Sequence, residues 1–306
     1  MNQSTSNILL VRPANFTFNQ QTAISNAFQN TVDLSPEEIK ARVIEEFDTF
    51  AERLINKGVN VMVVQDTHTP IKPDAVFPNN WGSFHADGTA ILYPIATPNR
   101  QVEKRPEIIG QIKARFKIEK LIDLSNHEAE CKFLEGTGSI VFDHMHKIAY
   151  ACLSPRTDRD VFIELCDIIN YKPVYFTATD KSGQEIYHTN VMMSVSKMFS
   201  VICLESIKDE RERNLVIDSL EQTGHEIISI TLEQVNYFAG NMISLLTQSG
   251  EEILVMSLSA FEVLTDQQKE AIGNYCEPFP MNTKTIETIG GGSARCMISE
   301  IFLPAK

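Results

Sequence analysis

The sequence predicts an α/β fold in which a unit of strand, hairpin strand, helix and strand appears about five times and closes into a ring. Short apolar runs rich in β-branched or aromatic residues recur along the chain, as buried strands do. Each of four such runs follows another strand-like run across a polar turn, which indicates a hairpin. The four expected hairpins are 81–84 with 89–93, 139–142 with 147–153, 191–195 with 199–204, and 242–246 with 252–258.

A helix is expected after the second strand of each unit. The clearest one begins at Ser35, with Pro36 in its first turn and Glu38 placed to complete a capping box. Gly58 should end this helix near Lys57. The other helices are expected at 103–116, 158–170, 209–223 and 265–274, and short closing strands at 59–64, 120–124, 173–176 and 226–230.

The two ends of the chain are expected to share one unit. The first unit begins at 7–11 and lacks a strand, whereas 294–302 is a spare strand. Pairing these two segments would close the ring and protect its edges. The alternative is an ordinary doubly wound sheet, but adjacent parallel strands need crossovers rather than tight turns. We therefore expect a single catalytic domain over residues 1–306.

Composition limits the classes of partner. The formal net charge is −13, without a clustered Lys/Arg stripe, which disfavours nucleic acid and anionic membranes. No apolar run approaches the ~20 residues that cross a bilayer, and the N-terminus lacks a signal-peptide pattern, so a cytoplasmic location is expected. The six cysteines include no CxxC pair, which argues against a structural zinc site or a disulfide framework.

Functional side chains should come from equivalent points of different units, where loops meet at one end of the ring. Asn80, Gly138 and Asn190 each lie nine residues before a return strand. Asn241, which follows Gly240, marks the corresponding point of the next unit. These positions are therefore candidates for a common pocket.

Three residues offer the chemistry of nucleophilic catalysis. Cys296 follows the glycines 290–292 and Arg295, and a cation beside a thiol favours the thiolate. His188 stands at the head of an apolar strand, and Glu135 lies in an apolar, glycine-rich run where an unpaired carboxylate would be costly. A thiol, an imidazole and a carboxylate together meet the needs of this reaction type. The structural alternatives are a core cysteine, a structural histidine and a solvated turn glutamate.

The remaining histidines lie in polar turns. His144 and His146 alternate as in a hairpin, but no companion ligands for a metal are apparent beside them. We therefore expect no metal and no cofactor.

Three segments resemble the signatures of the guanidino-group-modifying enzymes: 134–139, 188–190 and 290–297. This superfamily includes arginine deiminase, dimethylarginine dimethylaminohydrolase, succinylarginine dihydrolase and the glycine amidinotransferases. The resemblance implies a five-bladed α/β propeller, the pentein fold, built from ββαβ units. The segment 77–81 is most similar to amidinotransferase-like, citrulline-utilising hydrolases.

The resemblance also implies roles for individual residues. Cys296 would be the nucleophile that forms a covalent intermediate, His188 the general acid and base, and Glu135 the carboxylate that holds the substrate nitrogens. Arg100 and Arg156 resemble arginines that bind the substrate α-carboxylate, and bidentate binding suits arginine.

One departure from the family pattern bears on the substrate. Arginine deiminases have aspartates where this chain has Asn80 and Asn190, and neutral amides suit a neutral ureido group better than a guanidinium. We therefore expect a small-molecule substrate such as citrulline, although Glu135 alone leaves arginine-like substrates open. An amidinotransferase, a non-catalytic propeller that serves as an interaction module, and a homo-oligomer also stay open.

Overall fold

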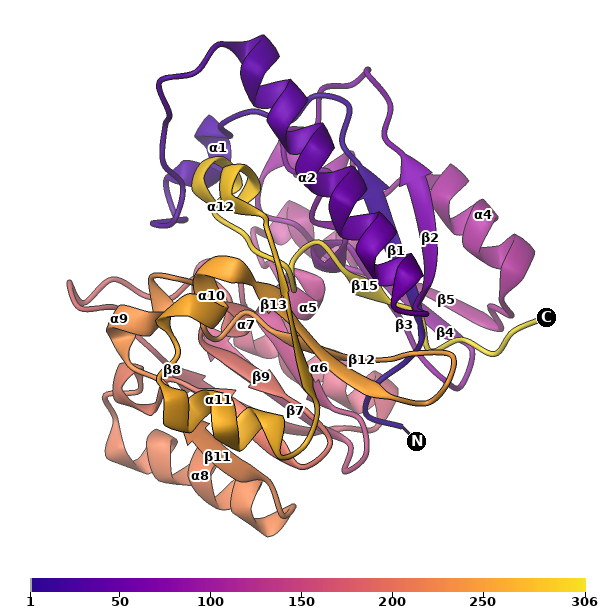
Figure 1. Cartoon of the computed structure of the whole chain (residues 1–306). Coiled ribbons are helices and arrows are strands. Elements are labelled where there is room, and N and C mark those ends of the chain that lie inside the picture. The colour runs from indigo at the N-terminus through magenta and orange to yellow at the C-terminus, as the bar shows by residue number, and fades with distance from the viewer. Residues whose placement is uncertain (1) are drawn as a thin grey trace.

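The computed structural model describes residues 2–306, which form five three-stranded sheets (Figure 1). In each sheet the middle strand pairs antiparallel with one neighbour and parallel with the other. The sheets, in strand order, are β15 (Ser299–Glu300), β1 (Asn7–Arg12) and β2 (Asn60–Gln65); β3 (Gly82–Phe84), β4 (Thr89–Leu92) and β5 (Lys120–Asp123); β6 (Ile140–Asp143), β7 (Ile148–Leu153) and β8 (Lys172–Thr177); β9 (Met193–Val195), β10 (Phe199–Ile202) and β11 (Glu226–Ser229); and β12 (Ile243–Leu246), β13 (Glu252–Ser257) and β14 (Glu277–Met281).

One longer helix leads from the middle strand to the parallel strand in every unit, as the spacing predicts. Ser35 caps the first of these helices with the expected capping box, and Asp158, Asp209 and Thr265 cap three others through their side chains. These five helices are α2 (Pro36–Asn56), α4 (Pro106–Arg115), α6 (Arg159–Ile169), α8 (Glu210–Gln222) and α11 (Asp266–Gly273).

The other helical segments are short, and most lie in the loops that lead into the sheets. They are α1 (Gln20–Ala23), η1 (Pro78–Asn80), α3 (Pro98–Gln101), η2 (Ser125–Glu130), α5 (Gly136–Ser139), α7 (Thr189–Met192), η3 (Leu204–Ser206), α9 (Leu232–Val235), α10 (Leu258–Val263) and α12 (Lys284–Gly290). Within residues 2–306, none of the helices carries an apolar stretch that would reach across a bilayer.

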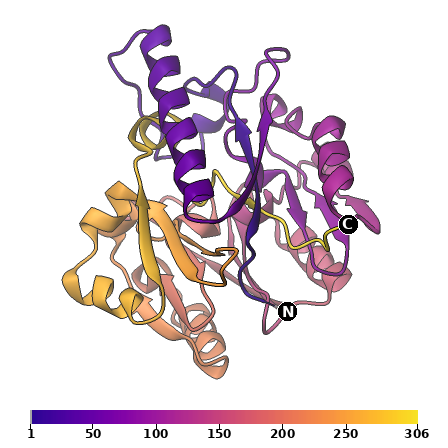
Figure 2. The same ribbon diagram turned by 45° about the vertical axis from the view of Figure 1, so that its right-hand side comes forward.

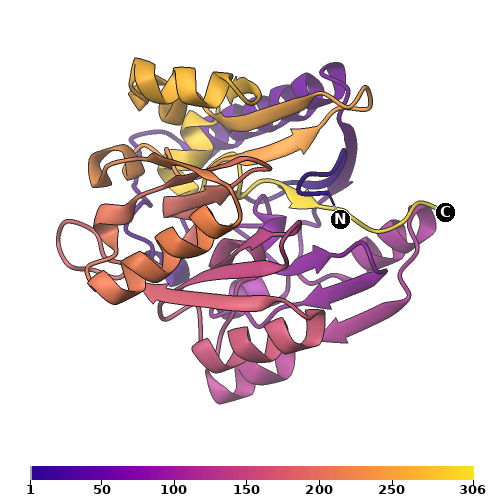
Figure 3. The ribbon, with the colours of Figure 1, turned by 90° about the horizontal axis from the view of Figure 1, so that it is seen from below.

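The end of the chain returns to its beginning. β15 pairs antiparallel with β1, with Ile8 opposite Glu300 (Figure 3). Ile301 forms a further bridge to Phe84 in the second sheet. The predicted strand 294–302 was too long, because Ser293 accepts a hydrogen bond from the backbone N–H of Cys296 and the chain turns there before β15 begins.

The fifth closing strand, β14, was not among the strands expected from the sequence. Its sequence includes Pro278 and Pro280, which lack the N–H that a central strand needs. β14 pairs only with β13 and lies at the edge of its sheet, where proline is tolerated.

Apolar faces of the helices cover the sheets and form the core. α2 lies along β1 and β2 (Figures 1 and 2) and directs Phe47, Phe50 and Leu54 inward, where they are buried in one cluster with Ile8 and Leu10 of β1. Burial of each such side chain contributes about 1.5–3 kcal/mol. The packed helices thus fix the sheets, and the sheets fix the loops at their ends.

Stability should depend on pH through His85, whose ring is buried and bonded at Nε2 to Ser83 Oγ, 2.8 Å away. Burial lowers the pKa of His85 to about 4. The unfolded chain, with a pKa of about 6.5, therefore binds more protons between these values, and the free energy of unfolding falls as pH falls from 6.5 to 4. We expect His85→Gln to reduce the difference in the free energy of unfolding between pH 7 and pH 5, measured by urea denaturation. The matched control is His68→Gln, which changes an exposed ring; an equal slope in all three proteins would contradict the assignment.

Candidate active site

Cys296 lies in a buried turn between α12 and β15. α12 ends at Gly290, and Gly291 adopts a φ of +63°, which a residue with a Cβ adopts only with strain. The Cys296 sulfur accepts hydrogen bonds from Asn241 Nδ2 at 3.3 Å and Asn190 Nδ2 at 3.5 Å. The sulfur thus faces two amide donors that come from different units of the chain.

The Asn241 amide is oriented by the backbone. Asn241 Nδ2 also donates to the carbonyl oxygen of Asn190 at 2.9 Å, and Asn241 Oδ1 accepts from the backbone N–H of Arg295 at 3.0 Å. Asn190 Oδ1 is buried and has no hydrogen-bond partner among residues 2–306. The Asn190 side chain therefore contacts the sulfur through Nδ2 and carries a free hydrogen-bond acceptor, Oδ1.

His188 and Glu135 form a buried pair: His188 Nε2 lies 2.8 Å from Glu135 Oε2. Glu135 directly precedes the short helix α5, and His188 directly precedes the short helix α7. The two residues thus lie just upstream of Gly138 and Asn190, two of the points expected to share a pocket. Burial lowers the pKa of His188 to about 4 and outweighs the opposing hydrogen bond with Glu135. The imidazole is therefore neutral at pH 7 and able to accept a proton.

Glu135 is held as a carboxylate. Burial alone would raise its pKa, but the charge of Arg156 and the hydrogen bond from His188 lower it below its usual range. Arg156 Nη1 lies 3.5 Å from Glu135 Oε2, and the backbone N–H of Ala96 donates to Glu135 Oε1 at 3.0 Å. The charge of Glu135 is thus already balanced by a neighbouring guanidinium.

Arg100, at the end of α3, is paired on several sides. Its Nε and Nη2 bind the carboxylate of Glu103 at 2.9 and 3.0 Å, and its Nη1 donates to Asn80 Oδ1 at 2.9 Å. Asp74 Oδ2 lies 3.7 Å from Nε. Arg100 therefore positions Asn80, and a substrate carboxylate would have to compete with Glu103 for its strongest donors.

A segment of residues 19–30, here called the cover, lies over the same region beside α12 (Figure 1). Arg156 binds it, with Nη2 donating to Ser25 Oγ at 2.7 Å and to the carbonyl oxygen of Thr22 at 2.8 Å. Asn26 Nδ2 donates to the carbonyl oxygen of Gly291 at 3.2 Å. The cover thus joins the arginine to the turn that carries Cys296.

These elements enclose one small cavity with about 260 Å³ of empty space, part of it open to solvent. Cys296, His188, Asn80, Arg100 and Arg156 line this cavity. Glu135 is fully buried and is not a lining residue, but it contacts His188. The lining residues that the sequence analysis did not single out are Asn26, Asp74, Phe77 and Tyr187.

Asp74 is the most informative of the missed residues. It is buried, and its Oδ1 has no hydrogen-bond partner among the residues described. Burial raises its pKa, against the effect of Arg100. Its position three residues before the segment 77–81 was the only signal in the sequence, and a lone aspartate in a polar turn is usually solvated.

A sequence profile places the chain in a family. The profile described as N,N dimethylarginine dimethylhydrolase, eukaryotic, matches residues 12–303, nearly the whole chain. The chain belongs to this family. Membership in the dimethylhydrolase family confirms the predicted superfamily. No curated protein matched the sequence itself.

Solved structures of similar fold come from the same superfamily. ArgZ, an arginine dihydrolase of the ornithine–ammonia cycle in cyanobacteria, superposes with a TM-score of 0.76 at 17% identity over 97% of this chain. The chain spans 41% of ArgZ, and it covers 98% of the separate N-terminal domain of ArgZ, solved with bound substrate, at a TM-score of 0.75. An enzyme of the dimethylhydrolase family from Pseudomonas aeruginosa, solved with citrulline, gives a TM-score of 0.66 at 14% identity over 97% of this chain and 100% of that one. At these identities the likeness is one of fold.

Proposed function

We propose that this chain hydrolyses the terminal C–N bond of an amino acid with a guanidino or ureido end, through a covalent intermediate on Cys296. The observation that carries the proposal is the arrangement of one cavity: the Cys296 sulfur with two amide donors, and a neutral His188 bonded to an anionic Glu135. Cys296, His188 and Glu135 come from three different units of the chain.

The proposed reaction has two halves. The Cys296 thiol gives its proton to His188, and the sulfur attacks the terminal carbon. The bond from that carbon to the departing amine then breaks, and His188 passes the proton to the amine. In the second half, water loses a proton to His188 and attacks the same carbon, the C–S bond breaks, and the proton returns from His188 to the sulfur. Glu135 stabilises the charged imidazole within each half.

The charges around the sulfur favour a neutral reacting group. Asn190 and Asn241, the side chains bonded to the sulfur, are uncharged, and the carboxylate of Glu135 already faces Arg156. A guanidinium beside these amides would lose its hydration, and the other buried carboxylate of the cavity, Asp74, already faces Arg100. Asn190 Oδ1 can accept an N–H from a ureido group. We therefore propose that a ureido amino acid such as citrulline is cleaved to an amine, CO2 and ammonia.

Substrates compared side by side test both statements. We expect ammonia release and NMR to show turnover of citrulline, and two equivalents of ammonia from any arginine consumed. Faster turnover of arginine than of citrulline would contradict the ureido assignment. Absence of ammonia from citrulline and arginine, together with absence of dimethylamine from dimethylarginine, would contradict hydrolysis itself.

Asn190→Asp should shift the choice of substrate. A carboxylate at this position would attract a guanidinium, so we expect the ratio of kcat/KM for arginine to that for citrulline to rise about tenfold, equivalent to about 1.4 kcal/mol. The ratio is the proper measurement because the extra charge also opposes the thiolate and slows both substrates. An unchanged ratio would show that Asn190 does not contact the reacting group.

We also propose that the five sheets form one closed five-bladed propeller and a single domain. The pairing of β15 with β1 and the bridge from Phe84 to Ile301 support closure between the first and second units. In such a ring the short helices before β6 and β9 meet at the axis, where Glu135 and His188 are found in contact.

A further inference from the structure

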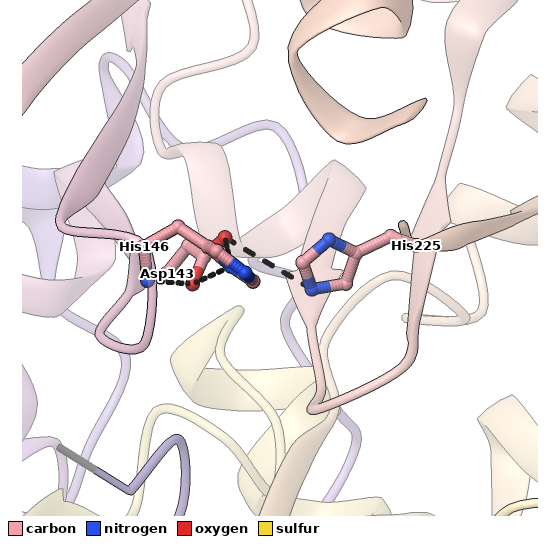
Figure 4. Close-up of side chains that lie close together, drawn as sticks. All are labelled: Asp143, His146 and His225. Atoms are coloured by element: carbon pink, nitrogen blue, oxygen red, sulfur yellow. Dashed lines mark hydrogen bonds and ion pairs between the residues drawn. The ribbon is translucent and has the colours of Figure 1, made fainter. Parts of the chain in front are cut away.

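A second cluster of polar side chains lies at the opposite ends of the hairpins from Cys296. β6 begins next to the active-site helix α5 and runs away from it to Asp143. His146 follows in the turn between β6 and β7, and His225 comes from the turn between α8 and β11 (Figure 4). The hydrolytic reaction has no use for these residues.

The cluster has the dimensions of a metal site. His146 Nδ1 lies 2.9 Å from Asp143 Oδ2, and His225 Nε2 lies 4.0 Å from the same oxygen. One ligand atom from each residue falls within 4.8 Å of the others. A metal ion with bonds of about 2.0–2.2 Å to nitrogen and oxygen holds tetrahedral ligands about 3.4 Å apart, so small rotations of the rings would suffice.

Asp143 is the residue that most needs a cation. Its side chain is fully buried, and its ion-pair partners within residues 2–306 are the two histidines, with no lysine or arginine. The backbone N–H of His146 also donates to Asp143 Oδ1 at 2.9 Å. A buried carboxylate without a permanent positive partner is costly.

We propose that Asp143, His146 and His225 bind one divalent transition-metal ion of the zinc class. Two imidazole nitrogens and one carboxylate oxygen are ligands that such ions prefer. The side chain of His146 is 36% exposed, so the ion can enter from solvent and a water molecule can complete its coordination. His144, which directly follows Asp143 in the sequence, is not one of these ligands, and its Nδ1 lies 2.8 Å from the hydroxyl oxygen of Tyr171.

The neighbours of His225 allow the tautomer that metal binding at Nε2 requires, in which the proton is on Nδ1. Its Nδ1 lies 2.8 Å from Thr223 Oγ1, which in turn lies 2.9 Å from the carbonyl oxygen of Leu220. In the structure Nε2 faces the carbonyl oxygen of Ser196 at 3.0 Å and carries the proton. Metal binding moves this proton to Nδ1, where Thr223 Oγ1 accepts it, so Nε2 gains a free lone pair without any change in the charge of the ring.

The bound ion would join two units of the fold. Asp143 and His146 belong to the hairpin of the third sheet, whereas His225 leads into β11 of the fourth. Because the ion binds the folded arrangement, it should raise the melting temperature and take no part in catalysis.

The test uses Zn²⁺ and Co²⁺ with Cys296→Ala as the parent protein, so that the active-site thiol cannot compete. Titration against a chelating dye should show one ion per chain, with a rise in melting temperature. His146→Ala should weaken binding at least tenfold and abolish that rise; because His146 lies in an exposed turn, this variant should fold. His225→Ala should do the same, and His68→Ala, an exposed control, should bind like the parent.

Spectroscopy adds an independent readout. Bound Co²⁺ should give the d–d spectrum of a site with nitrogen and oxygen ligands and no thiolate charge-transfer band. Failure of the parent to bind either ion, equal binding by His146→Ala, or a thiolate band would each overturn the proposal. None of these outcomes bears on C–N hydrolysis, since the parent lacks the nucleophile.

Discussion

Replacing Cys296 with alanine is expected to lower kcat by a factor of about a thousand or more, because no neighbouring group can form the covalent intermediate. The fold should persist, because the Cys296 side chain is small and other bonds hold the turn. The carbonyl oxygen of Ser293 accepts from the backbone N–H of Cys296, and Asn241 Oδ1 accepts from the backbone N–H of Arg295. Ammonia release measures the loss, and circular dichroism and thermal melting check the fold.

Two further measurements separate a nucleophile from a merely structural cysteine. Cys131→Ala removes an exposed thiol and should leave the rate unchanged. Mass spectrometry of the wild-type protein during turnover should detect an adduct on Cys296. Wild-type rates in Cys296→Ala, or an adduct on another cysteine, would remove Cys296 from the mechanism.

Gly138→Ala is expected to produce the second large effect. A Cβ at this position would lie 2.2 Å from Asn80 Nδ2 and 2.7 Å from His188 Nδ1, so both side chains would have to move. A displacement of about 1 Å in a catalytic group can cost about a hundredfold in rate, and we expect kcat to fall by about that factor.

Gly110→Ala is the matched control, since the same methyl group at position 110 of α4 meets nothing within 4 Å. That variant should keep its activity and gain about 0.5–1 kcal/mol in the free energy of unfolding, because alanine favours the helix interior. Full activity in Gly138→Ala would show that the imidazole tolerates displacement and that its present position is not required.

The sequence was most informative where chemistry follows the repeat. The repeat placed Asn80, Gly138 and Asn190 at equivalent points of their units. Glu135 and His188 lie just upstream of the second and third of these points, and their side chains meet. The five longer helices were predictable because capping residues and apolar spacing are local signals.

Tertiary contacts left weaker signals in the sequence. The cover has no apolar periodicity, and its bonds are made by polar residues such as Asn26 to a turn 265 residues further along the chain. The same reason hid the companions of His146, since His225 reaches Asp143 only after the third and fourth sheets have packed. β14 was not expected because it contains Pro278 and Pro280, which are tolerated only because the strand pairs with β13 on one side.

The pairing of β15 with β1 makes the position of Cys296 depend on a contact between distant parts of the chain. Only two residues, Met297 and Ile298, separate Cys296 from β15, and Ser299 of β15 lies opposite Leu9 of β1. Contacts between residues so far apart in the sequence carry a large loop-closure entropy and tend to form slowly. We therefore expect the sulfur to take its place beside Asn190 and Asn241 late in folding, after the more local hairpins have formed.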